Sequence, residues 1–135
     1  MPKEDYLIKY LEKLSRVIAA MLGLKEAGKQ NDALRLADEA FKETLSVNVN
    51  DLLNFSDEEF QALILKNSFT IAYLQKLCDL SLIIIDTLYE KGAIENMKNL
   101  SRKTLLLHRI LNEKDKTFSF EREATIADLQ KIIDY

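Results

Sequence analysis

The chain has 135 residues, of which 47% are hydrophobic and 30% charged, with a formal net charge of −3. This length fits one domain with its own core, and the slight excess of acids gives no sign of general binding to nucleic acids or anionic membranes. Three glycines and one proline leave few signals for tight β-turns and favour long helices.

The first third of the chain, residues 1–46, predicts two helices in an antiparallel hairpin. Residues 3–27 carry an apolar stripe at helical spacing, and Gly28 ends it. A second helix over residues 32–46 is expected to be capped by one of its first polar residues, Asn31 or Asp32. The link between these helices is short, which favours a hairpin.

The middle third, residues 47–91, predicts a connector, a short helix and a long apolar helix. In the connector, residues 47–55, Asn50 is expected to cap a short turn. Ser56 and Glu59 have the spacing of a capping box, so a helix should begin there and run to about Lys66.

Residues 69–91 form the most apolar stretch, and the chain is organised around it. Asn67 or Ser68 is expected to cap this helix, and Gly92 to end it. Charged residues within its length argue against a membrane span. We therefore expect a buried core helix, with the lone cysteine, Cys78, as a small buried hydrophobe.

The last third, residues 92–135, predicts a helix pair. The first helix should cover residues 94–113, and Ser119 should cap the second. No segment alternates with period two, so we expect no sheet. The sequence thus predicts a single all-α domain of five to six helices in stacked antiparallel hairpins.

The first hairpin resembles a tetratricopeptide repeat. Gly28 stands at the turn, Ala33 follows five positions later and Ala40 seven after that. Ala37 stands where the repeat pattern has an aromatic residue, and no proline ends the unit. The resemblance implies a right-handed superhelical array of hairpins that binds other proteins.

The whole chain is also similar to an uncharacterised family of small bacterial helical proteins. This similarity is carried by the opening DYLIKYLEKLSRVIAAMLGLKEAG and by Ala33-Leu34 and Asp38-Glu39-Ala40. It implies a bacterial protein, and because the family has no established activity, it indicates no mechanism.

Patterns typical of catalysis are not evident. The single histidine, His108, has no metal-ligating neighbour at helical spacing, and we expect it at the edge of the core or on the surface. The three scattered glycines form no phosphate-binding loop, and no nucleophile elbow is present. We expect no enzymatic activity, no cofactor and no metal.

Two groups of charged residues are candidate binding sites. Asp79 and Asp86 lie two turns apart on one side of the apolar helix. They are either a solvent-facing stripe, with Lys76 pairing to Asp79, or the floor of a polar groove for a partner peptide or a cation.

The second group is basic and lies on the helix over residues 94–113. Lys98, Arg102 and Arg109 share one face, with Lys103 beside them. This is either a solvated face or a docking patch for an acidic partner, which another copy of the chain could supply through its acidic middle.

The leading functional hypothesis is a non-catalytic protein–protein interaction module, an adaptor or scaffold. It would bind an unknown protein through a groove between hairpins or through the basic face. One alternative is a structural homo-oligomer, such as a homodimer. Another is a small-ligand sensor or enzyme with a groove near Asp79 and Asp86, aided by Tyr73 or His108. The charged N-terminal sequence predicts a cytoplasmic protein.

Overall fold

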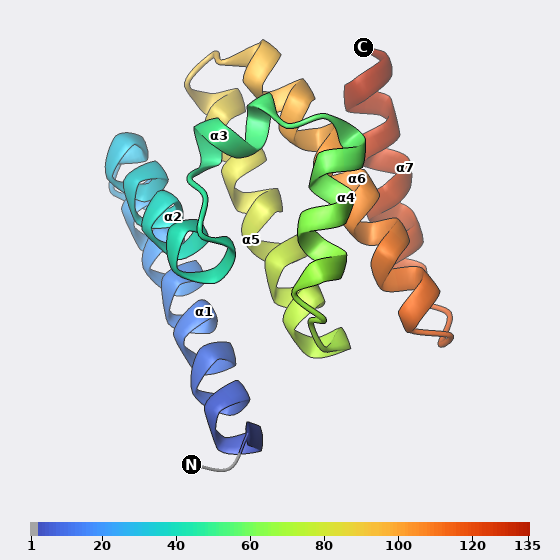
Figure 1. Ribbon diagram of the computed structural model, residues 1–135. Helices are drawn as coiled ribbons and strands as arrows, with labels where there is room; N and C mark the ends of the chain where they lie inside the picture. Colours follow the sequence, from blue (N-terminus) through green and yellow to red (C-terminus); the bar gives the residue numbers. More distant parts are fainter. Residues whose placement is uncertain (1–2) are drawn as a thin grey trace.

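The computed structural model describes the backbone of residues 3–135 and the side chains of residues 8–135. This part of the chain forms seven helices and no strand (Figure 1). The helices are α1 (Lys3–Glu26), α2 (Gln30–Leu45), α3 (Val49–Asn54), α4 (Asp57–Lys66), α5 (Ile71–Glu90), α6 (Ile94–Lys114) and α7 (Phe120–Asp134). The predicted all-α class is confirmed. The predicted count of five to six helices is wrong, because the connector contains a helix of its own.

That additional helix is α3, and its cap is Asn48, two residues before the expected cap at Asn50. The side chain of Asn48 accepts a hydrogen bond from the amide of Asp51 at 2.7 Å. Asp38 of α2 accepts another from the amide of Val49 at 2.9 Å. These two acceptors satisfy amides of the first turn that have no partner within the helix, so a six-residue helix forms in the connector.

The helices are arranged as hairpins that stand side by side (Figure 1). α1 pairs with α2, α5 pairs with α6, and α7 packs on the outer side of α6. Both α1 and α2 pack against α5, while α4 lies in front of α6. The segment α3–α4 is thus inserted between two hairpins that contact each other directly.

Both hairpin turns use the same backbone motif. Gly28 and Gly92 each have φ +75°, in the left-handed region that favours glycine. The residue after each glycine, Lys29 or Ala93, bonds through its amide to a carbonyl five residues back, at 2.8 and 2.9 Å. This is the Schellman motif, and it ends α1 and α5 where the sequence predicted.

The two turns also lie next to each other. Glu90 at the end of α5 accepts a hydrogen bond from Gln30 at 3.1 Å and pairs with Lys25 at 3.4 Å. Lys91 donates to Asn31 across the same gap. The hairpins therefore stand in the same direction, turn beside turn.

Besides the cap of α3, helix caps follow the sequence at two sites and depart from it at two others. Ser56 and Glu59 form the predicted capping box, and Ser119 caps α7. α2 begins at Gln30 with no side-chain cap, so Asn31 and Asp32 lie inside its first turn.

α5 is capped by neither of the two residues expected, Asn67 and Ser68. Asn67 is the C-cap of α4, and Ser68 takes a left-handed φ of 52° that reverses the chain. Instead, the hydroxyl of Thr70 caps α5 by accepting a hydrogen bond from the backbone amide of Tyr73 at 3.2 Å.

The core is centred on α5, as predicted. Leu74, Leu80 and Ile84 are each 0% exposed, and so is Cys78. The seam between α1 and α2 is lined by small side chains from α2, and Ala33 and Ala37 are fully covered. Within residues 3–135, no helix is long and apolar enough to cross a membrane.

Candidate functional site

An open groove of about 600 Å³ lies where the end of α5, the start of α6 and the end of α7 meet. We call it the C-terminal groove. Its lining residues are Ile85, Asp86, Tyr89, Ile94, Met97, Lys131, Ile132 and Tyr135. Grooves of this volume are large enough to enclose several side chains of a bound segment.

The two long walls of the groove carry the same kinds of side chain. The α5 wall presents Ile85, Asp86 and Tyr89, and the α7 wall presents Lys131, Ile132 and Tyr135. Each wall thus has one isoleucine, one tyrosine and one charge, and the charges are opposite. The tyrosines are 65% and 94% exposed, which is unusual for large aromatic side chains.

The charges of the two walls are available for a partner. Neither Asp86 nor Lys131 has a side-chain hydrogen bond or ion pair with any residue whose side chain is described. Lys98 of α6 lies near the α7 wall, with its Nζ 5.9 Å from the ring centre of Tyr135, which is cation–π distance.

Asp79, the other predicted aspartate, lies outside the groove. Its carboxylate is half-buried and accepts a hydrogen bond from Gln75 Nε2 at 3.1 Å. The predicted pair between Lys76 and Asp79 is absent from the described side chains, so that prediction is wrong. The predicted stripe is therefore divided, with Asp86 in the groove and Asp79 in a hydrogen-bond network near the other end of α5.

The centre of that network is Arg122, at the start of α7. Its side chain is only 9% exposed. Nη1 donates to Asn112 at 3.1 Å, and Nη2 donates to Asp115 at 3.1 Å and to Gln75 at 3.3 Å. Nε is buried and has no hydrogen-bond partner among the described residues. Arg122 thus joins α5, α6 and α7, a role that sequence reasoning missed.

Asp115 is the acidic partner of this arginine. Two hydrogen bonds hold the pKa of Asp115 below its usual range. The larger effect is from the backbone amide of Thr117, which donates to Oδ1 at 3.1 Å, and the smaller is from the guanidinium of Arg122. The turn between α6 and α7 is therefore ordered around an ionised carboxylate at neutral pH.

One residue of the predicted basic face of α6, Lys103, is not at the surface. Lys103 is only 3% exposed. Its Nζ donates to Asn99 Oδ1 at 2.9 Å, and Asn99 in turn donates to the carbonyl of Leu53 at 2.7 Å. Burial lowers the pKa of Lys103, and the carboxylate of Asp57 partly offsets this. Asn99 therefore joins α3 to α6, and Lys103, which is buried and bonded to Asn99, does not belong to an exposed patch.

The other basic residues stay at the surface. Arg102 and Arg109 are exposed, and no side-chain partner for either is found within residues 8–135. Lys98 is half-buried beside Tyr135. Their binding of an acidic partner stays a prediction.

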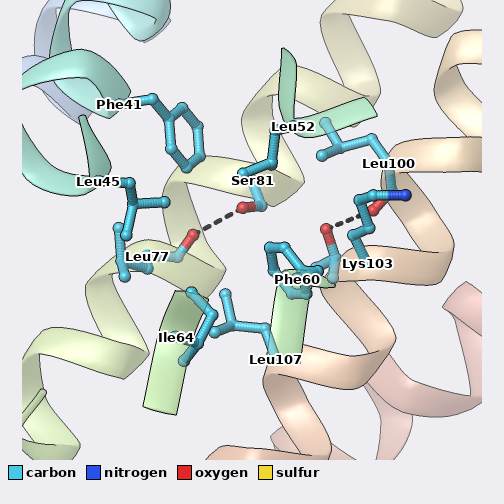
Figure 2. Close-up of a pocket in the computed structure, with 11 residues that line it drawn as sticks. Phe41, Leu45, Leu52, Phe60, Ile64, Leu77, Ser81, Leu100, Lys103 and Leu107 are labelled. Atoms are coloured by element: carbon cyan, nitrogen blue, oxygen red, sulfur yellow. Dashed lines mark hydrogen bonds between the residues drawn. The ribbon is translucent and has the colours of Figure 1, made fainter. Parts of the chain in front are cut away.

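A small cavity of about 10 Å³ lies next to Lys103, between α2, α3, α4, α5 and α6 (Figure 2). Ser81 and Thr104 line it, and each hydroxyl donates to a carbonyl of its own helix at 2.8 Å. The amino group of Lys103 points away from Phe41 and Leu77 (Figure 2). The space holds about one water molecule, so this cavity is a packing defect and no substrate site.

The remaining candidates for chemistry are buried and separate from the groove. His108 is 2% exposed, with Nδ1 2.8 Å from the carbonyl of Thr104, and burial lowers its pKa. The expectation of a core-edge or surface histidine is therefore wrong. Burial also raises the pKa of the Cys78 thiol, and Tyr73 is buried with its hydroxyl on Thr44. Within the described residues, no cluster of metal-ligating side chains is found.

A second, shallower groove of about 340 Å³ runs between the first hairpin and the helices α3, α5 and α6. Its mouth is polar, with Asn31, Arg35, Asn50 and Asn96, and its floor contains Ile84 and Leu88. We call it the inter-hairpin groove.

Comparison with known proteins finds no matching family model, no matching curated protein and no matching solved structure. The resemblances to tetratricopeptide repeats and to an uncharacterised bacterial family therefore stay predictions.

Most residues of the C-terminal groove were missed by sequence reasoning. Of its lining residues, only Asp86 was predicted from the sequence as a candidate binding residue. The signal that could have found the others is the position of large apolar residues at helix ends, such as Tyr89 and Ile94 on either side of Gly92. Side chains beyond the last covered turn of a helix have fewer neighbours to bury them.

Proposed function

We propose that the protein is a non-catalytic interaction module that binds a short segment of a partner protein in the C-terminal groove. One observation carries the proposal: an open apolar groove of about 600 Å³ is bordered by two largely exposed tyrosines. Exposed apolar surface of this kind is typical of binding sites, and tyrosine is among the residues that contribute most at protein interfaces.

The charges of the walls define the chemistry of the segment. Asp86 on one side favours a basic residue, and Lys131 on the other favours an acidic one. Between them, the apolar walls favour two large hydrophobic anchors. Because the two charges are opposite, they fix the direction in which a segment lies, and they contribute more to orientation than to affinity.

The arrangement of hairpins supports the wider proposal of a tetratricopeptide-like array. The hairpins α1–α2 and α5–α6 share one turn motif and stand turn beside turn. The segment α3–α4 departs from a regular array, because tandem repeats place successive hairpins next to each other in sequence. We propose that this segment is an insertion between two repeat-like units.

The inter-hairpin groove and the basic face of α6 are weaker candidates. The inter-hairpin groove has polar side chains at its mouth, and one of its lining residues, Asp38, already accepts a hydrogen bond from the amide of Val49. Arg102 and Arg109 are exposed charges that line neither of the two grooves, and exposed charge pairs contribute little affinity on their own.

Selection from a random peptide library displayed on phage tests the proposal. We expect enrichment of peptides with two large apolar residues between a basic and an acidic residue. Tyr89→Asp should abolish the binding of selected peptides, because it places a charge on the apolar wall. Leu22→Asp is the matched control, since Leu22 is 45% exposed on α1, away from the groove, and should leave binding unchanged.

A charge exchange sharpens the test. Asp86→Lys should lower the affinity for a selected peptide by up to about fivefold, which is the range of one exposed ion pair. A peptide whose basic residue is changed to glutamate should bind the Asp86→Lys protein with the original affinity. Absence of any enriched peptide, or enriched peptides that bind Tyr89→Asp as well as the unchanged protein, would refute the proposal.

A further inference from the structure

Two largely exposed phenylalanines lie where the turn between α6 and α7 meets the start of α7. Phe118 is 65% exposed and Phe120 is 82% exposed. Their rings contact each other edge to face, with centroids 4.8 Å apart and an interplanar angle of 88°, which is a favoured geometry for an aromatic pair. The pair forms a single projecting unit, and we call residues 116–121 the aromatic knob.

The aromatic knob and the C-terminal groove lie at opposite ends of α7. The knob is at the start of this helix, and Lys131, Ile132 and Tyr135 are at its end. Figure 1 shows the α6–α7 connection at the lower end of the molecule and the C-terminus at the upper end. The 15 residues of α7 span about 22 Å at 1.5 Å per residue. A chain therefore cannot place its own knob in its own groove.

We propose that the aromatic knob of one copy inserts into the C-terminal groove of a second copy. This inference rests on the proposed function, since it names the segment that the groove binds. The knob has the composition that the groove walls favour: two large apolar side chains, preceded by Lys116 and followed by Glu121.

The charges of the two surfaces are complementary. Lys116 of the knob suits Asp86 of the α5 wall, and Glu121 suits Lys131 of the α7 wall. All four side chains are exposed, and none has a side-chain hydrogen bond or ion pair within the described part of the molecule. Insertion would thus satisfy four charges without breaking an existing contact.

The contact joins two different surfaces, so it is heterologous. A pair therefore keeps one free groove, on the copy that supplied its knob, and one free knob, on the other copy. Unless the rotation between copies closes a ring, such contacts extend into open chains. Because one knob covers a small area, the association should be weak and dependent on concentration.

Two variants separate the two surfaces. Phe120→Asp disables the knob and leaves the groove intact, and Tyr89→Asp disables the groove and leaves the knob intact. Both positions are more than half exposed, so the helical fold should persist, which circular dichroism checks. Leu22→Asp on α1 is again the matched control.

Sedimentation equilibrium provides the readout. For the unchanged protein and for Leu22→Asp, the weight-average mass should rise steadily with concentration and pass the mass of a dimer. Each of the two surface variants alone should stay monomeric. Their equimolar mixture should form a one-to-one complex and stop there, because only one functional knob and one functional groove remain.

A synthetic peptide of residues 113–123 gives a second readout. It should bind the Phe120→Asp protein, and Tyr89→Asp should weaken that binding by about tenfold or more, as expected when a hot-spot aromatic is lost. Replacing both phenylalanines of the peptide with serine should abolish binding.

Three results would overturn the inference: a monomeric protein at all concentrations, a mixture of variants that does not associate, or a dimer that persists in both variants. None of them refutes the proposed function, which the library selection decides separately. If selected peptides bind at Tyr89 while the protein stays monomeric, the groove binds a foreign segment and not a second copy.

Discussion

Replacing Arg122 with methionine tests how α7 is held on the rest of the molecule. Only Leu129 of this helix is fully buried, so its apolar contact is limited for its length. The guanidinium of Arg122 adds polar attachment through Asn112, Asp115 and Gln75. Methionine keeps the packing of the aliphatic stem and removes all three hydrogen bonds.

The expected loss of stability follows from these contacts. Each hydrogen bond contributes about 1 kcal/mol, because water can replace part of the interaction at the half-buried partners. Removing the buried, unpartnered Nε returns about 1 kcal/mol of desolvation energy. The net destabilisation is about 2 kcal/mol, which lowers the melting temperature by about 8 °C for a domain of this size.

Thermal unfolding followed by circular dichroism measures the shift, and hydrogen exchange shows where it acts. The amides of α7 should lose protection, while those of α1 and α2 keep it. Arg122→Lys is the matched control. It keeps the charge but not the planar fork, so it should recover only part of the loss. A methionine variant that melts within about 2 °C of the unchanged protein, or an α7 with unchanged protection, would refute this account of Arg122.

Three further predictions concern single residues. Ser56→Ala removes the cap of α4 and should lower the unfolding free energy by about 1 kcal/mol in urea titration; an unchanged midpoint would show that the cap contributes nothing. Cys78 should react with a thiol reagent at pH 8 only after denaturant is added, because burial raises its pKa and blocks access, and rapid labelling of the native protein would contradict this. The folded pKa of Asp115 is below its unfolded value, so its contribution to stability is present at neutral pH and lost as the pH falls below about 4. Asp115→Asn should therefore flatten the fall of stability with acid, and an unchanged pH profile would exclude this role.

Local signals predicted the helices well because they depend on residues close together in the chain. Gly28 and Gly92 take left-handed conformations that few other residues tolerate, so they ended α1 and α5 correctly. The capping box of Ser56 and Glu59 is a contact over three residues, and it forms as expected.

Features that depend on distant parts of the chain were not predictable in this way. α3 begins after Asn48 because Asp38, ten residues before Asn48 in sequence, accepts a hydrogen bond from the amide of Val49. Lys103 is one residue from the exposed Arg102 and is buried because α3 and α4, through Leu52 and Phe60, cover the same part of α6. The C-terminal groove exists because the ends of α5 and α7 and the start of α6 border one space, and no pattern within any of these helices encodes that arrangement.

The insertion of α3–α4 between two contacting hairpins has a consequence for how the chain folds. Each hairpin is built from neighbouring helices, and local contacts of this kind form quickly. The contact of α1 with α5 must instead close a loop that contains α2, α3 and α4. We therefore expect the joining of the two hairpins to be the slow step. Because each doubling of loop length adds only about 0.6 kcal/mol of closure entropy, extra residues in the short links beside α3 should slow this step little and leave the native state almost as stable.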